Sequence, residues 1–419
     1  EMCIRDRCYA KLKTQMSFHL TEIGYRGDEN VLESMAVSTQ NRYDIDHFAE
    51  TANNGILNDI WNAWYNGIYR CNDVLDHMTG AKIANYDKYR GECLFLRSWW
   101  YFNLYRVFGV VPITRTVVTP AAAKLIPRCT EEEMYTLLTE DLAEAARLLP
   151  PTPGPEKARV ANIAAYPLLA KVYLTFGKPA EAKTALEEAM KNTSYGLEST
   201  TKKVFDVGNK MNREIIFALY YNKTNDNGHG YWYSANTDVL ADINNPTPTF
   251  KAIYDSEKDN RLPLISSYTK IKDNLFAMTK WYDTYDATYT TQVGNDFPHL
   301  RYADVVLMYA EALAESGGSL GDALEWLNKT RTRAGLDELT TDEVKSLAEF
   351  RRELAAERGR EFALEGHRWF DLVRLGLAVD YFREMGYSLD SHNLIFPIPQ
   401  NQIEIVNNPS ILWQNPGFN

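Results

Sequence analysis

The stretch AAYPLLAKVYLTFGKPAEAKTALEEAM, residues 164–190, decides the fold of this 419-residue chain. Apolar and small residues recur on both sides of Gly177 at the three- and four-residue spacing of a helix face. Small side chains such as Ala170 and Ala182 allow two antiparallel helices to approach closely. The stretch therefore predicts a helix over about 160–176, a turn at Gly177 and a second helix over about 179–190.

The same arrangement occurs again late in the chain. Small residues, a tyrosine and a glycine stand at the positions typical of a tetratricopeptide unit, namely Ala170, Tyr173, Gly177, Ala182 and Ala189. Ala310, Gly317 and Ala323 repeat part of the pattern, with one extra residue in the turn. We predict that residues 160–190 and 300–335 form two helix pairs within one helical body, which a long segment of different character interrupts.

Three earlier segments also have helical periodicity. Residues 58–78 and 89–108 each place apolar side chains three or four positions apart. Thr130 followed by Glu133 is a capping box, which predicts a third helix that begins there and runs to about residue 149.

The segment between the two helix pairs has a different composition. From residue 195 to about 298 it is rich in Asn, Asp, Thr, Gly, Pro and Tyr, and only short runs such as 214–221 have a strand-like pattern. Long loops in a compact protein are usually functional. We predict a mainly α fold, a tetratricopeptide-like helical scaffold with a loop-rich irregular lobe that contains short strands.

The predicted organisation is a single domain from residue 8 to residue 419. It consists of a helical scaffold over about 8–194 and 298–380, a loop-rich insertion over about 195–297, and an irregular, non-helical C-terminal wrap over 381–419. Residues 1–7, EMCIRDR, read as translated sequencing adapter and are excluded from the fold.

Charge and motif content argue against several classes of protein. A net charge of −11 without a basic run argues against nucleic acid and anionic lipid as partners. No stretch approaches the ~18 consecutive apolar residues of a membrane-spanning helix. The sequence lacks H-E-x-x-H, G-x-S-x-G, Walker A and G-x-G-x-x-G motifs, and its His and Cys residues lack metal-ligand spacing. We predict a binding protein without a metal or cofactor, not an enzyme.

The densest run of charge covers residues 351–374. Glu361 and Glu365 stand four apart, and Arg368, Asp371 and Arg374 follow at intervals of three, as in a ladder of ion pairs along one helix face. Phe362, Gly366, Trp369 and Val373 would form an adjoining apolar stripe. We predict one structural helix packed on the core and disfavour the alternative, a charged binding groove.

Five motifs occur in an order that resembles the SusD/RagB family. They are GECLFLR at 91–97 followed by YFNLYRVFGVVP at 101–112, LRYADVVLMYAEAL at 300–313, LNKTRTRAG at 327–335, REFALEGHRWFDLVR at 360–374, and FPIP at 396–399 with QNPGF at 414–418. Together they cover the chain from about residue 20 to its end. This resemblance implies a lipid-anchored protein on the outer face of the outer membrane, which captures oligosaccharides and covers a SusC-like TonB-dependent transporter as a lid.

The resemblance also implies a lipid-bearing cysteine and a linker before the first helix. Here Cys8 runs directly into a helical stretch. We therefore expect the lipid-bearing cysteine and the native start to lie upstream of the printed sequence.

Three segments combine aromatic residues with amide and carboxylate side chains, which is the mixture that binds sugars. Their candidate ligand-binding residues are Tyr43 and Phe48 in the first, Tyr231, Trp232, Tyr233 and Asn236 in the second, and Trp281, Tyr282 and Tyr285 in the third. The second segment is favoured, because the side chains of three consecutive aromatic residues diverge and cannot all enter one core. For each segment the alternative is packing beneath its own loop.

Other functions remain open at this point. The same aromatic loops suit capture of peptides. A tetratricopeptide adaptor would need a continuous repeat array, which the long insertion and the Pro-rich C-terminus argue against. A glycoside hydrolase would need a carboxylate pair at a pocket, and 56 acidic residues make such pairs common by chance.

Overall fold

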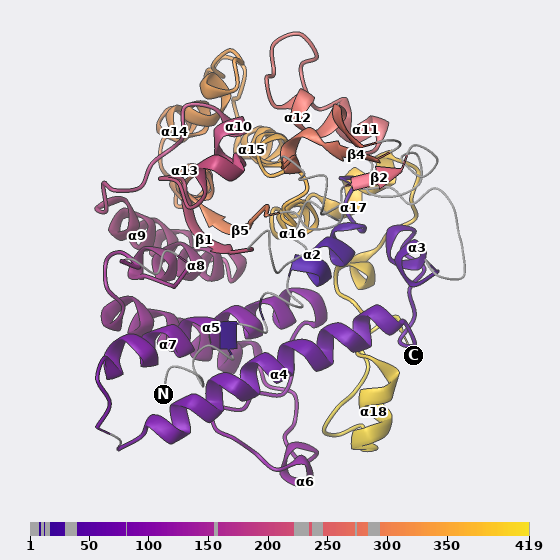
Figure 1. The fold of residues 1–419 in the computed structure, drawn as a ribbon. Helices are drawn as coiled ribbons and strands as arrows, with labels where there is room; N and C mark the ends of the chain where they lie inside the picture. The colour runs from indigo at the N-terminus through magenta and orange to yellow at the C-terminus, as the bar shows by residue number, and fades with distance from the viewer. Residues whose placement is uncertain are drawn as a thin grey trace.

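The computed structural model describes residues 8–9, 12, 17–29, 40–80, 82–154, 158–221, 234–236, 246–272, 275–283 and 294–418. Within these ranges the chain is mainly helical, and consecutive helices stack side by side (Figure 1). None of the helices in this part of the chain is both long and apolar enough to cross a membrane.

The helical body is a stack in which each helix packs on the next. Its members are α4 (Gly55–Met78), α5 (Tyr86–Phe108), α7 (Glu131–Leu148), α8 (Asn162–Thr175), α9 (Pro179–Met190), α13 (Tyr302–Glu315), α14 (Leu320–Arg333) and α15 (Leu347–Glu361). α8 pairs with α9, α13 pairs with α14, and α13 also packs on both α8 and α9. The prediction of two distant helix pairs in one body is confirmed.

Local sequence explains how these helices begin and how closely they approach. Thr130 and Glu133 form the predicted capping box at the start of α7. Where α4 crosses α5, a Cβ on Gly67 would lie 2.3 Å from a ring carbon of Trp100, so the large indole requires glycine opposite it.

The insertion contributes two small sheets. β1 (Ile215–Leu219) pairs antiparallel with β5 (Phe297–Arg301), which leads directly into α13. β4 (Leu275–Met278) lies between β2 (Ser234–Asn236) and β3 (Tyr268–Lys272) in the second sheet. The short helical elements of the segment are α10 (Thr201–Val204), η2 (Val207–Asn209), α11 (Pro248–Lys251), α12 (Leu262–Ser266) and η4 (Thr279–Trp281). The predicted strand-like run at 214–221 is confirmed as β1.

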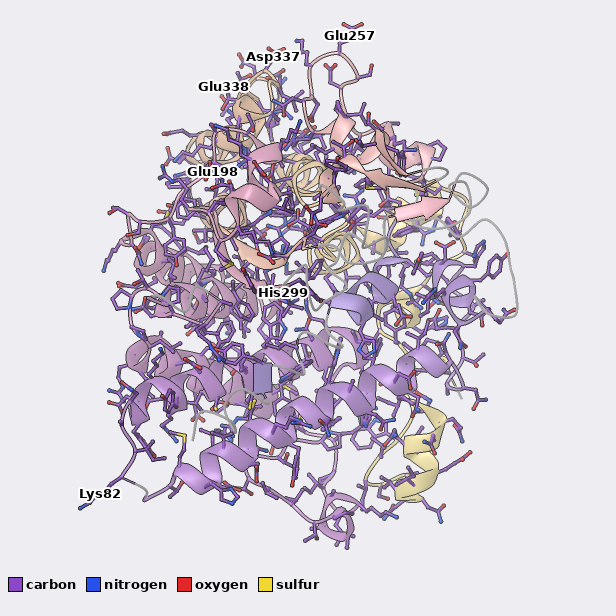
Figure 2. The ribbon with its side chains drawn as sticks, viewed as in Figure 1. Lys82, Glu198, Glu257, His299, Asp337 and Glu338 are labelled. Atoms are coloured by element: carbon purple, nitrogen blue, oxygen red, sulfur yellow. The ribbon has the colours of Figure 1, made fainter. Side chains whose placement is uncertain are left out.

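Figure 2 shows which of the labelled side chains lie at the surface and which lies in the interior. Lys82 and Glu257 project from its periphery, whereas His299 on β5 lies inside. The imidazole centroid of His299 is 4.8 Å from Trp99 of α5 and 5.7 Å from Phe217 of β1. Burial lowers the pKa of His299 to about 3, so its ring is neutral and joins the aromatic core.

Two expectations for the C-terminal part are wrong. The run over 351–374 is two helices, because α15 ends at Glu361 and α16 (Arg368–Arg374) begins after a turn in which Leu364 and Gly366 have φ of 63° and 75°. The C-terminal segment is not free of helix either, since three more elements follow: α17 (Ala378–Glu384), η5 (Ser391–Leu394) and α18 (Gln400–Val406). The remaining short helices are α2 (Ser17–Gly24), α3 (Gln40–Asp46) and α6 (Pro120–Ala123).

The predicted ladder of ion pairs along one helix face is also wrong in most of its members. Asp371 and Arg374 do pair at 3.1 Å. Glu361 and Glu365 instead pair with Arg301 on β5, at 2.6 and 2.8 Å. The turn between the two helices directs these carboxylates into the interior, where partners from distant segments meet them.

This interior network joins the insertion to the helical body. Arg301 also pairs with Glu214, beside β1, at 2.8 Å. The complete cluster contains the cations Arg261, Lys280, Arg301, Arg333 and Arg360 and the carboxylates Glu214, Asp259, Glu357, Glu361 and Glu365. Burial alone would raise the pKa of Glu361, but the charges of the surrounding arginines outweigh it and hold that pKa well below its ordinary value. The Glu361 carboxylate is therefore ionised, and the cluster contains equal numbers of cationic and carboxylate side chains.

Arg301→Met is expected to lower the free energy of unfolding by about 3–5 kcal/mol, because it leaves three buried carboxylates with one cation fewer. Urea denaturation followed by circular dichroism measures this loss. Arg383→Met is the control, since the pair of Arg383 with Asp380 lies at the surface with side chains 62% and 79% exposed. That pair should contribute less than about 1 kcal/mol, and equal losses in the two variants would contradict the central role of Arg301.

Gly366→Leu is expected to lower the free energy of unfolding by about 1–3 kcal/mol, for a different reason than an apolar stripe. A side chain at φ 75° is strained, and its Cβ would lie 3.3 Å from Cβ of Leu20. Gly177→Leu separates the two effects, because Gly177 has φ 67° but nothing within 4 Å of the added Cβ. Thermal unfolding should show that Gly366→Leu lowers the melting temperature more than Gly177→Leu does. An unchanged melting temperature in Gly366→Leu would show that the position tolerates a side chain.

Candidate functional site

The first predicted segment is a short helix followed by a turn that caps α4. Tyr43 lies on α3, half-buried, with its ring stacked on His47 at a centroid distance of 3.8 Å. Asn54 ends the segment, and its side chain accepts a hydrogen bond from the amide of Ile56 at 3.0 Å. The cap fixes where α4 begins and leaves part of the Tyr43 ring accessible.

Phe48, a predicted ligand contact, is half-buried and packs on one side against other aromatic rings. Its ring lies 5.1 Å from Phe382 and 5.3 Å from Tyr387, both in edge-to-face geometry, and 5.8 Å from Trp369. The guanidinium of Arg26 lies 5.1 Å from the same ring. These contacts join the segment after α3 to α16 and α17, and they leave part of the ring exposed.

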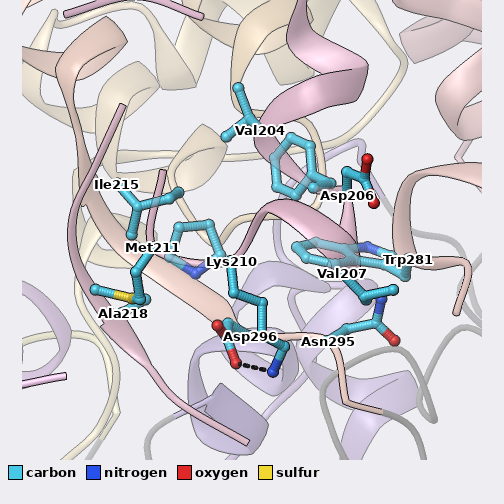
Figure 3. Close-up of a pocket in the computed structure, with 12 residues that line it drawn as sticks. Val204, Asp206, Val207, Lys210, Met211, Ile215, Ala218, Trp281, Asn295 and Asp296 are labelled. Atoms are coloured by element: carbon cyan, nitrogen blue, oxygen red, sulfur yellow. Dashed lines mark hydrogen bonds and ion pairs between the residues drawn. The ribbon is translucent and has the colours of Figure 1, made fainter. Parts of the chain in front are cut away.

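Trp281 is also a core residue, contrary to the prediction. It is 1% exposed, and its indole meets Phe205 edge-to-face at 5.1 Å. Figure 3 shows it beside a small hollow of about 20 Å³, roughly the volume of one water, where Lys210 and Asp296 pair at 2.8 Å. No face of this indole is open to stack on a sugar ring.

Tyr282 and Asn236 are placed only in part by the structure. Tyr282 follows Trp281 and is half-buried, and its carbonyl accepts a hydrogen bond from the side-chain amide of Asn295 at 3.4 Å. Asn236 ends β2, where it pairs with Leu275 of β4. The other candidates, Tyr231, Trp232, Tyr233 and Tyr285, lie outside the described residues.

The residues that directly follow α2 connect the first candidate segment, residues 40–54, to the insertion. The carbonyl of Asp28 accepts a hydrogen bond from the hydroxyl of Thr247, which caps α11, at 3.0 Å. The carboxylate of Asp28 accepts hydrogen bonds from Tyr381 of α17 and from Arg368 of α16. α3 and β2 lie toward the same side of the molecule in Figure 1. The fold thus brings parts of the chain that are distant in sequence to that side.

Three exposed aromatic residues in the described ranges were not predicted from the sequence, and Tyr69 on α4 is one of them, 49% exposed. Trp413 is 41% exposed, with the guanidinium of Arg128 4.8 Å from its ring. Tyr220 is 45% exposed, with the ammonium of Lys210 4.4 Å from its ring. The exposure of Trp413 could have been predicted, because it is a tryptophan in a polar, Pro-rich C-terminal segment. The exposure of Tyr220 could not, because it stands in a strand-like run.

The chemistry of Trp413 and Tyr220 suits binding. Each offers an aromatic face beside amide or charged groups, as sugar recognition requires. Within the described ranges, no group of three or more His, Cys, Asp or Glu is arranged to hold a metal ion.

Comparison with known proteins adds independent findings. A family model described as "SusD family" matches residues 256–418, and one described as "Starch-binding associating with outer membrane" matches residues 11–174. The chain is 26% identical to SusD-like protein P2 of Formosa agariphila over 90% of its own length and 84% of that protein's.

Solved structures share the fold over nearly the whole chain. A SusD-like protein from Bacteroides fragilis has a TM-score of 0.82 at 21% identity, with 99% of this chain and 96% of the other covered. Surface glycan-binding protein A from Bacteroides thetaiotaomicron, solved in complex with laminarihexaose, has a TM-score of 0.80 at 21% identity, with 99% and 98% covered.

Phe48→Ala is expected to lower the free energy of unfolding by about 2–3 kcal/mol, because it removes the half-buried ring from its contacts with α16 and α17. Tyr43→Ala, an aromatic truncation on the same segment, should cost less than about 1 kcal/mol. Chemical denaturation of the two variants measures both losses. If Tyr43→Ala lost more stability than Phe48→Ala, Phe48 would not be needed for packing and would remain a candidate ligand contact.

Proposed function

This chain belongs to the SusD/RagB family, and we propose that it captures oligosaccharides at the cell surface and delivers them to a SusC-like TonB-dependent transporter of the outer membrane. The family consists of non-catalytic carbohydrate-binding proteins. The observation that carries the proposal is the match of family models to both the N-terminal and the C-terminal parts of the chain.

Two findings support a glycan as the cargo. The model that matches residues 11–174 is described by starch binding and association with the outer membrane. A structural neighbour that covers nearly the whole chain was solved with laminarihexaose bound. Starch is a neutral glucose polymer and laminarihexaose is a neutral glucose oligomer, so neutral oligosaccharides are the first class of ligand to test.

We propose that Tyr231, Trp232 and Tyr233, together with Asn236 and Tyr43, provide the binding surface. An importer must release what it binds, so a micromolar dissociation constant, about −8 kcal/mol, is sufficient. One or two stacked aromatic faces and a few amide hydrogen bonds can supply that energy without a deep pocket. Attachment to the membrane through a lipid anchor, as the family resemblance implies, completes the proposal.

Trp232→Ala is the direct test of this surface, with Trp281→Ala as its matched control. Titration with laminarihexaose and maltohexaose should show that Trp232→Ala weakens binding at least about tenfold, the equivalent of one lost stacking contact. Its melting temperature should stay near that of the wild type. Trp281→Ala should lower stability by about 3–5 kcal/mol, because its indole is buried.

The reverse pattern would contradict the proposed surface. If Trp232→Ala lowered the melting temperature and kept full affinity, Trp232 would be a packing residue. If the wild type bound neither hexasaccharide but bound extended peptides, the cargo would be a peptide.

A further inference from the structure

A pocket of about 530 Å³ lies between the C-terminal end of α5, α8, α16 and the chain at the end of η5. Its volume falls within the range of about 300–1,000 Å³ that is usual for small-molecule sites. One wall is apolar, formed by Val110, Phe370 and Ile395. The other walls carry charge, and the way these charges pair decides what the pocket can hold.

Three of the six Lys, Arg, Asp and Glu residues that line the pocket, Lys171, Asp371 and Arg374, belong to a set of ion pairs that continues behind it. Lys171 pairs with Asp304 at 2.5 Å, and Arg358 joins Asp304 to Asp371 at 2.9 and 2.8 Å. Arg374 pairs with Asp371 at 3.1 Å and with Glu311. The set contains the cations Lys171, Arg358 and Arg374 and the carboxylates Asp304, Glu311 and Asp371, so its charges balance.

Arg106 lines the same pocket and is outside this set. Its guanidinium lies 3.9 Å from the ring centroid of Phe370 and 4.8 Å from that of Phe102, and Nη2 donates to the side-chain oxygen of Asn103 at 2.5 Å. Nε is buried without an acceptor, and Arg106 forms none of the ion pairs of the set, although Asp371 and Asp304 act on its charge at longer range. Burial lowers the pKa of Arg106 to about 9, so the group remains charged at neutral pH.

Arg128 is a second cation at the pocket, and the groups that accept its hydrogen bonds are neutral. Nε donates to the carbonyl of Val110 at 2.7 Å, Nη1 to the carbonyl of Trp413 at 2.9 Å, and Nη2 to the side-chain oxygen of Asn415 at 2.7 Å. Glu131 is the carboxylate at the pocket outside the balanced set, and it accepts a hydrogen bond from Tyr105 at 2.8 Å. Two arginines and one carboxylate leave the pocket with a net positive charge in a chain whose net charge is −11.

We propose that this pocket binds a small carboxylate of the size of a sugar acid, such as one uronate unit. The guanidinium of Arg106 supplies the uncompensated charge for the carboxylate, a pairing that is stronger than a hydrogen bond between neutral groups. The apolar wall covers the face of the sugar ring, and Glu131 is the carboxylate that opposes a bound anion. The site goes beyond capture of a neutral oligosaccharide, because it uses none of the aromatic candidate residues.

Isothermal titration with glucuronate, glucose and inorganic sulfate at constant ionic strength tests the proposal. We expect glucuronate to bind and glucose to bind at least about tenfold more weakly, since glucose lacks the charged group. Sulfate that bound as tightly as glucuronate would overturn the assignment to a sugar acid, and so would equal affinities for glucose and glucuronate.

Two variants with opposite expected effects locate the site. Arg106→Met keeps an unbranched apolar stem, removes the guanidinium, and should weaken glucuronate binding at least about tenfold. Glu131→Gln removes the negative charge that repels the ligand, and it should therefore tighten the binding of glucuronate. Arg147→Met is the matched control, because Arg147 is exposed, pairs with Glu144 at 2.8 Å and does not line the pocket.

The outcome remains decisive if Arg106→Met fails to fold by circular dichroism. In that case Glu131→Gln decides, and unchanged or weaker glucuronate binding in that variant would refute the site. Laminarihexaose binding should be the same in all three variants, so a failure of this proposal is distinguishable from a failure of the proposed function.

Discussion

Arg301, at the end of β5, is the residue on which the arrangement of the insertion and the helical body depends. Its guanidinium holds Glu214 from the start of the insertion, Glu361 from the end of α15 and Glu365 from the turn before α16. A buried charge without partners costs several kcal/mol, whereas a balanced buried network has little net effect on stability. The network therefore acts mainly through specificity, because only one arrangement of these segments pairs all of its ions.

That constraint explains how a loop-rich insertion can lie on a helical body in one orientation. Lys280 of η4 reaches Glu365, and Arg261 beside α12 reaches Glu357 of α15, so the insertion is attached at several points. Loops positioned by a rigid scaffold are where binding residues usually lie.

The sequence was sufficient to predict the helix pairs of the helical body, but not the helices of the C-terminal part or the partners of the buried charges. Spacing located α8, α9, α13 and α14, since small residues at helix contacts leave a local pattern. The same reasoning assigned Glu361 and Glu365 to one helix face, because spacing cannot reveal that Leu364 and Gly366 turn the chain or that Arg301 lies opposite. The predictions for two aromatic residues missed their packing neighbours for the same reason. Trp281 and Phe48 stand among polar neighbours in sequence, and only the tertiary fold shows that other rings pack against them.

The central claim, that the protein binds an oligosaccharide and returns it unchanged, is tested most directly by one titration. The wild-type protein is titrated with a panel of neutral oligosaccharides, and each ligand is recovered and analysed by chromatography. The account predicts micromolar binding of at least one glycan, about −8 kcal/mol, with the ligand recovered at full length. Shortened products, or the absence of binding to every glycan of the panel, would contradict it.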